Sequence, residues 1–253
     1  MDNAIVHKLK TMTSQFYESC AESFSATRQN AWNGWHKVCD LIAESTNENL
    51  QIIDIACGNF RFEKFIQNEL GARKNVNFSC VDNCLPLSTD APANVNFKEC
   101  DIISALENGT SFTELNFVPA DYLVSFGFMH HIPSEKLRLR FLEYALSCIK
   151  PGGYLIISFW QFLKNPSLAR KANEKRAAAL QAYKIDDSQL EDGDCFLGWQ
   201  ESTKLFRYCH NFTDEEVYSY IKKLPSNIKL LTSFNADGKQ DDLNLYIVIQ
   251  KEE

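Results

Sequence analysis

The chain has 253 residues, of which 45% are hydrophobic and 23% are charged, and this composition favours one globular domain with extensions. The net charge of −7 excludes a chain that coats nucleic acid non-specifically, because that mode of binding needs an excess of Lys and Arg; a local basic patch stays compatible with an RNA substrate. The start of the chain lacks a signal segment, and no apolar run approaches the ~20 residues that span a bilayer. We therefore expect a cytoplasmic protein with no membrane partner and nine free thiols, and no metal site, because no Cys-x-x-Cys pair occurs.

Two helices are predicted near the N-terminus, because apolar residues recur at helical spacing over 16–24 and again after Gly34. From residue 50 onward, short apolar runs alternate with helical stretches. The predicted strands cover 50–55, 75–81, 94–99, 121–126 and 154–160, with helices over 60–70 and 134–149 and a turn at 151–153. This alternation predicts parallel βαβ units in a Rossmann-like α/β sheet.

The alternation of strands and helices ends after the fifth predicted strand. Residues 166–183 are predicted to form a helix, 186–199 an acidic irregular stretch, and 213–224 a helix with Thr213 as N-cap and Glu216 closing a capping box. Strands over 227–233 and 243–251 predict an antiparallel hairpin at the sheet's edge. A sheet of about seven strands, with an antiparallel C-terminal hairpin and a helical N-terminal extension, is typical of class I methyltransferases.

A turn of small residues follows the first predicted strand. Asp54 ends the strand and Ala56-Cys57-Gly58 lead into the helix, so the backbone can approach a bound nucleoside closely. The glycine-rich turn that holds a dinucleotide pyrophosphate, G-x-G-x-x-G, is incomplete, because Gly58 is the one glycine in this turn and Ala56 and Phe60 stand where further glycines are expected. We therefore predict S-adenosylmethionine (SAM), which has no phosphate, rather than NAD.

Acidic residues after the next two strands support the same cofactor. Asp82 is expected to accept both ribose hydroxyls, with turn capping as the alternative, and Asp101 to accept the adenine amine beside the Ile102 N–H. Tyr17 and Arg28 are expected to close a lid over SAM, with helix packing as the alternative. The predicted cofactor contacts are Tyr17, Arg28, Asp54, Ala56, Cys57, Gly58, Asp82, Asn83, Asp101, Ile102, Ser125 and Phe126.

Further motifs resemble those of the tRNA methyltransferases that esterify 5-carboxymethyluridine at the wobble position, together with their bacterial relatives. The resemblance extends over about 14–222 and implies SAM-dependent methyl transfer, a tRNA substrate and a small zinc-binding activator protein as partner. The motifs that carry it are Phe16-Tyr17-Glu18, Phe24-Ser25-Ala26-Thr27-Arg28, Trp32, Phe128-Met129-His130-His131-Ile132, Gly193-Asp194, Gly198-Trp199 and Arg207-Tyr208-Cys209-His210.

The predicted acceptor site combines histidines after the fourth strand with the late motif. Methyl transfer from a sulfonium is an in-line displacement that needs a well-held nucleophile and excluded water. A carboxylate acceptor needs only positioning, whereas an amine or phenol would use a histidine as base. Packing, capping or surface ion pairs are the alternatives. The predicted catalytic residues are His130, His131, Arg207, Tyr208 and His210.

We thus predict a single methyltransferase domain over 1–253, with a lid at 1–48, a SAM-binding core at 49–160, a substrate-side insertion at 161–224 and a hairpin at 225–253. Methyl esterification of the carboxymethyl group on a tRNA wobble uridine is the leading hypothesis. The alternative is O- or N-methylation of a small molecule or natural product. The basic residues of 164–175 could form a phosphate-facing patch, which would suit tRNA, or simply a solvated helix face. A non-catalytic SAM-binding subunit is a third hypothesis, against which Asp54, Asp82 and Asp101 argue.

Overall fold

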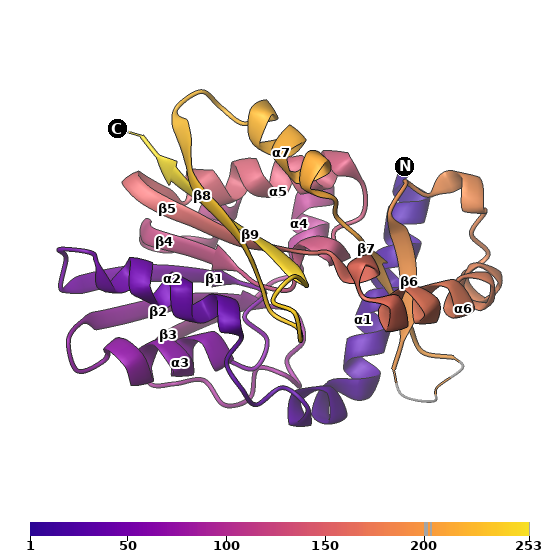
Figure 1. Cartoon of the computed structure of the whole chain (residues 1–253), viewed down its shortest axis with the longest axis horizontal. Helices are drawn as coiled ribbons and strands as arrows, with labels where there is room; N and C mark the ends of the chain where they lie inside the picture. The colour runs from indigo at the N-terminus through magenta and orange to yellow at the C-terminus, as the bar shows by residue number, and fades with distance from the viewer. Residues whose placement is uncertain (200–201, 203, 253) are drawn as a thin grey trace.

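The computed structural model describes residues 1–199, 202 and 204–252, and a seven-stranded sheet forms its centre (Figure 1). The strands of this sheet are β1 (Asn49–Ile55), β2 (Asn75–Asp82), β3 (Val95–Glu99), β4 (Ala120–Ser125), β5 (Ile149–Trp160), β8 (Ile228–Ala236) and β9 (Asn244–Lys251). Their order is β3-β2-β1-β4-β5-β9-β8. The first five pair in parallel, while β9 pairs antiparallel with β5 and with β8. The predicted Rossmann-like sheet with a C-terminal hairpin is confirmed.

Helices cover both faces of the sheet because alternate strand residues point to opposite sides. On one face, Ile52 of β1 packs in a cluster with Trp35 and Ile66; on the other, Ile53 packs in a cluster with Phe141. The helices of the first face are α2 (Asn33–Ala43) and α3 (Arg61–Leu70), and those of the second are α4 (Ile102–Asn108), α5 (Glu135–Ser147) and α7 (Asp214–Lys223).

A second, smaller layer lies beside one end of the sheet (Figure 1). It consists of α1 (Asn3–Ala26), α6 (Pro166–Tyr183) and a two-stranded sheet of β6 (Asp194–Gly198) and β7 (Phe206–His210). Leu9 and Met12 of α1 are fully buried against Phe196 and Tyr208. The predicted N-terminal helical extension is confirmed, but its first helix begins at Asn3 because this apolar face extends further toward the N-terminus.

The prediction of an irregular stretch over 186–199 is wrong, since Asp194–Gly198 forms β6 and pairs antiparallel with β7. The acidic residue that suggested a loop is buried in the pair. Asp194 accepts hydrogen bonds from the Tyr208 hydroxyl and the His210 ring, both at 2.7 Å. Its charge is therefore satisfied inside the fold rather than by water.

Two other local predictions are also wrong. The helix expected over 134–149 ends at Ser147, and β5 begins at Ile149, so the Pro-Gly-Gly run lies inside a strand, with Gly152 at φ 77° beside a shift in register. Thr213 does cap α7 by accepting the Glu216 N–H at 3.2 Å. The Glu216 carboxylate does not complete a capping box, because it bonds instead to the side chains of His210 and Tyr220.

Candidate active site

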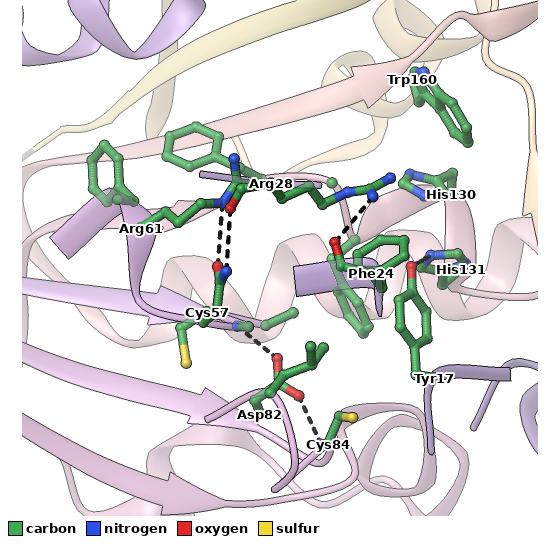
Figure 2. Close-up of a pocket in the computed structure, with 18 of the residues that line it drawn as sticks. Tyr17, Phe24, Arg28, Cys57, Arg61, Asp82, Cys84, His130, His131 and Trp160 are labelled. Atoms are coloured by element: carbon green, nitrogen blue, oxygen red, sulfur yellow. Dashed lines mark hydrogen bonds between the residues drawn. The ribbon is translucent and has the colours of Figure 1, made fainter. Parts of the chain in front are cut away.

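A cavity of about 610 Å³ lies at the carboxyl ends of β1 to β5, where open α/β sheets bind ligands (Figure 2). Helices α1 and α2, β7 and the turn between β8 and β9 complete its wall. The predicted site residues that line it are Tyr17, Arg28, Asp54, Ala56, Cys57, Gly58, Asp82, Asn83, Asp101, Ile102, Phe126, His130, His131 and Arg207. Ser125, Tyr208 and His210 are outside its lining. Ser125 instead donates its hydroxyl to the Ile55 carbonyl at 2.8 Å.

The turn after β1 keeps a left-handed backbone at positions where glycines were expected. Ala56, Gly58 and Phe60 have φ angles of 67°, 58° and 57°. The N–H groups of Ala56 and Cys57 donate to the Val81 carbonyl at 2.8 and 3.1 Å, which fixes the start of the turn. A left-handed non-glycine residue costs about 1–2 kcal/mol. Full burial of the Phe60 ring in the core beneath the loop offsets this cost and keeps the ring out of the cavity.

Asp82, at the end of β2, holds the turns on either side of it. One carboxylate oxygen accepts the Gly58 N–H at 2.9 Å and the other accepts the Cys84 N–H at 2.8 Å, as the dashed lines in Figure 2 show. Each oxygen keeps a lone pair for a ligand hydroxyl, so capping and ribose binding are compatible. Asp101 likewise caps α4 by accepting from the Ser104 N–H and hydroxyl at 2.9 and 2.7 Å while lining the cavity.

A hydrogen-bonded chain links α1, the turn after β4, and β7 at the other end of the cavity. The Tyr208 carbonyl accepts from Nδ1 of His131 at 2.8 Å, which makes Nδ1 the protonated nitrogen. Nε2 of His131 must then accept the Tyr17 hydroxyl proton at 2.8 Å. The same hydroxyl oxygen accepts from Nη1 of Arg207 at 3.0 Å. One tautomer of His131 therefore fixes the orientation of Tyr17 and of the guanidinium.

Both histidines of this region are neutral. Burial, then the nearby Arg207 charge, lowers the pKa of His131 to about 3. Burial, then His131, holds the pKa of His130 well below its usual value. The His130 ring lies 4.7 Å from the Trp160 ring between centroids, and its Nδ1 has no hydrogen-bond partner among the described residues. His130 is thus the histidine with an unused nitrogen beside the cavity.

Two arginines bring positive charge to the same end. Arg207 is buried and Arg28 is half-buried, and neither has an ion-pair partner among the described carboxylates. The Arg28 guanidinium lies 3.4 Å above the Phe24 ring centroid and points toward His130 (Figure 2). Burial, then the charge of Arg207, lowers the pKa of Arg28 to about 10, so it stays protonated at neutral pH. Desolvated cations without carboxylates favour an anionic ligand.

The described residues include one group with the donor types of a metal site, formed by His130, His131 and Cys209, whose ligand atoms lie within 4.8 Å of one another. Both ring nitrogens of His131 are already engaged, by Tyr17 and by the Tyr208 carbonyl. The positive charge of Arg207 also acts on both imidazoles. A cation would have to displace these partners against that charge, so the group does not fit a metal ion.

The late motif divides between two sides of β7. Arg207 lines the cavity, whereas Tyr208 and His210 both bond to Asp194 on the opposite side of the strand. Nε2 of His210 also bonds to Glu216 at 2.9 Å. This separation follows from the two-residue period of a strand, which directs alternate side chains to opposite faces. Tyr208 therefore contributes to the site through its backbone carbonyl, which bonds to His131. His210 contributes only indirectly, by holding β7 in place.

The predicted set of site residues omitted several that lie at the site, among them Arg61, Trp160 and Glu63. Trp160 lines the cavity beside His130, and no local pattern distinguishes it from a core tryptophan. Glu63 is completely buried on α3 next to Asp54. Its signal was present in the sequence, since Glu63 precedes Ile66 and Leu70 by three and seven residues and so lies on the buried face.

No family model matches the chain. The Bos taurus protein named "Probable tRNA methyltransferase 9B" is 27% identical over 160 residues, which are 63% of this chain and 31% of that protein. The tRNA (carboxymethyluridine(34)-5-O)-methyltransferase of Arabidopsis thaliana is 26% identical over 151 residues, which are 60% of this chain and 33% of that protein. The chain spans about a third of the length of these relatives.

Solved structures share the fold at low sequence identity. A SAM-dependent methyltransferase of Methanosarcina mazei is 18% identical with a TM-score of 0.58, over 84% of this chain and 97% of that one. The N-methyltransferase NodS of Bradyrhizobium japonicum, in complex with S-adenosyl-l-homocysteine (SAH), is 10% identical with a TM-score of 0.51, over 86% of each chain. A chain of the Haloferax volcanii complex that contains the Trm112 methyltransferase activator is 12% identical with a TM-score of 0.54, over 94% and 98%.

The fold is that of the SAM-dependent methyltransferases, as the strand order and the cavity at the carboxyl ends of the parallel strands had indicated. Within that class, the sequence resembles the tRNA carboxymethyluridine methyltransferases, and the resemblance inferred from the motifs is confirmed. No described helix is both long enough and apolar enough to span a membrane.

Proposed function

We propose that this chain is a SAM-dependent methyltransferase whose acceptor is a carboxylate, namely the 5-carboxymethyl group of a tRNA uridine. The observation that carries the proposal is the pair Arg28 and Arg207, two cations that face one cavity without a carboxylate partner among the described residues. A carboxylate supplies the charge that both lack. The similarity to carboxymethyluridine methyltransferases supports the same acceptor chemistry.

The other end of the cavity suits SAM. Asp82 retains lone pairs for ribose hydroxyls, and Asp101 and Ile102 line the part of the wall proposed to hold adenine. Asp54 presents a buried carboxyl group, with one oxygen unpartnered, to the ammonium of the methionine moiety. SAM supplies an electrophilic methyl group on a sulfonium centre. The left-handed turn at 56–60 lets the backbone approach this ligand.

The residues around the acceptor bind and orient it. Arg28 and Arg207 hold the carboxylate, and Tyr17, itself fixed by His131, holds Arg207 in place. No general base is required, because a carboxylate is already ionised at neutral pH. The neutral histidines neither protonate the acceptor nor compete for it as cations. The aromatic side chains that line this end exclude water from the displacement.

A small carboxylic acid is the second candidate acceptor, and the charge distribution of α6 favours it. Most basic residues of this helix are engaged by neighbours; Lys171 is exposed and has no described side-chain partner. Arg170 pairs with Glu174 and Arg176 with Asp187, while the Lys175 ammonium donates to the Ser202 carbonyl at 3.1 Å. The phosphate-facing patch expected over 164–175 is therefore largely neutralised.

The remaining parts of the proposal concern organisation and partners. The chain acts as a single domain in which 1–48 closes over the cofactor, 49–160 binds it, 161–224 contributes to acceptor binding and 225–253 closes the sheet. The fold shared with the Trm112-containing complex supports a small activator protein as a partner.

Transfer of labelled methyl groups tests the acceptor. The protein is incubated with labelled SAM and tRNA from cells that lack its gene, and in parallel with a small-molecule extract of the same cells. A methyl ester releases its label in mild base, whereas an N-methyl group does not. Base-labile label in tRNA supports the proposal, and base-labile label in the extract alone supports the second candidate. Base-stable label, or no SAH binding by calorimetry, contradicts it.

A further inference from the structure

Asp54 and Glu63 form a pair of buried carboxyl groups beneath the cofactor turn. Asp54 is 3% exposed and lines the cavity, while Glu63 on α3 is fully buried behind it. The described residues place no Lys, Arg or His in an ion pair with either group. One oxygen of each, Oδ1 of Asp54 and Oε2 of Glu63, is buried and has no hydrogen-bond partner among the described residues.

The surroundings of the pair determine where a proton resides. The Cys80 thiol donates to Oε1 of Glu63 at 3.0 Å, which favours the ionised form of Glu63. Burial, then the negative charge of Glu63, raises the pKa of Asp54 well above its usual value, and the nearby Asp82 raises it further. Burial also raises the pKa of Glu63, while the Cys80 thiol and then the neighbouring Asp54 act to lower it.

The other titratable groups around the pair do not neutralise it. The Cys57 thiol has its pKa raised to about 12 by burial and stays uncharged. Of the two cations on α3, the Lys64 ammonium pairs with Asp90 at 2.6 Å, and the Arg61 guanidinium donates to the Asn59 side chain and the Asn30 carbonyl. Two full negative charges in this buried place would be strongly destabilised.

We propose that Asp54 and Glu63 share one proton, which bridges their two unpartnered oxygens, and that Glu63 thereby sets the charge with which Asp54 meets the cofactor's ammonium group. The inference rests on the proposed function for its ligand. Glu63 is a positioning residue, because it is buried behind Asp54 and outside the cavity lining.

The shared proton links cofactor binding to pH. An ammonium group next to Asp54 stabilises the doubly ionised pair, so binding expels the proton from the free protein. Below the pKa of the free pair, affinity then rises about tenfold per pH unit, and about one proton leaves per cofactor bound. Glu63→Gln replaces the second acid with an amide that donates to an ionised Asp54. This variant binds without proton release and binds more tightly than the parent at acidic pH.

The test uses SAH, which carries the same ammonium group. Calorimetry at matched pH in two buffers of different ionisation enthalpy gives the number of protons released, for the parent, Glu63→Gln and the control Glu69→Gln. Glu69 lies on the exposed side of the same helix. Infrared spectra of the cofactor-free protein report the C=O stretch of a protonated carboxyl group at neutral pH.

The expected result is proton release and a carboxylic C=O band in the parent and in Glu69→Gln, with both lost in Glu63→Gln. Equal heats in the two buffers across the acidic-to-neutral range overturn the proposal, as does a C=O band that survives the Glu63→Gln change. If SAH fails to bind every variant, the proposed function falls, and the infrared band alone then decides whether the proton is shared.

Discussion

Replacing His210 by leucine tests the buried network that joins the insertion to the core. His210 is 1% exposed and bonds to Asp194 at 2.7 Å through Nδ1 and to Glu216 at 2.9 Å through Nε2. The Asp194 side chain is 0% exposed, and its partners are His210, the Tyr208 hydroxyl and the Glu191 N–H, of which only His210 can carry a positive charge. The His210→Leu change would leave a buried carboxylate with two neutral donors, the Tyr208 hydroxyl and the Glu191 N–H, and no positive charge beside it.

The expected loss of unfolding free energy is about 3–5 kcal/mol, the cost of removing one partner from a buried ion pair. The loss depends on pH. Burial alone would lower the pKa of His210, but its bonds to Asp194 and Glu216 outweigh burial and raise it. A raised pKa contributes stability that is complete below the unfolded value of about 6.5 and is lost as pH rises through the folded pKa. The difference between parent and variant is therefore largest on the acidic side.

Urea unfolding at pH 6 and at pH 9 measures both effects. His7→Leu is the control, because His7 is exposed on α1 and makes no described side-chain bond, so its change stays within about 0.5 kcal/mol. A loss below about 1 kcal/mol at pH 6, or a loss that grows at pH 9, would show that His210 is not a charged link between Asp194 and Glu216.

Three further changes separate the roles of the cavity residues. Asp82→Ala removes the acceptor of two backbone N–H groups and the proposed ribose contact, so SAH binding measured by calorimetry is abolished; retained affinity contradicts this role. Tyr17→Phe breaks the link between Arg207 and His131 and reduces kcat/KM by about 5–30-fold, the equivalent of 1–2 kcal/mol, with SAH affinity unchanged. Arg207→Met raises KM for the acceptor about a hundredfold, as expected for a lost charge-assisted contact of ~3 kcal/mol, and leaves SAH affinity intact; an equal loss of SAH affinity would refute it.

The sheet and the cofactor end of the cavity were predictable because their signals are local. A buried strand followed by a small-residue turn and a helix recurs along the chain, and Asp54, Asp82 and Asp101 each stand next to such a strand end. The acceptor end was only partly predictable, because it joins α1, the turn after β4, and β7. Which residues of 207–210 face the cavity depends on how side chains alternate between the two faces of β7. The strand that pairs with it, β6, was not predicted because it begins with a buried aspartate, Asp194.

The distribution of charge in the cavity connects the two proposals. At the cofactor end, Asp54 and Asp82 have no ion-pair partner among the described residues, although Asp101 pairs with Lys10 at 3.5 Å; at the acceptor end, Arg28 and Arg207 have none either. These four side chains therefore lack the charge that the neighbouring proposed ligand carries. Transfer of a methyl group from a sulfonium to a carboxylate cancels one positive and one negative charge. Exclusion of water favours that cancellation, since charges are less stable in a low dielectric. Arg28 and Arg207 hold the carboxylate most strongly before it loses its charge, and this contact acts on the bound substrate more than on the transition state. The loss of Arg207 should therefore appear in KM, whereas kcat changes by less than about tenfold.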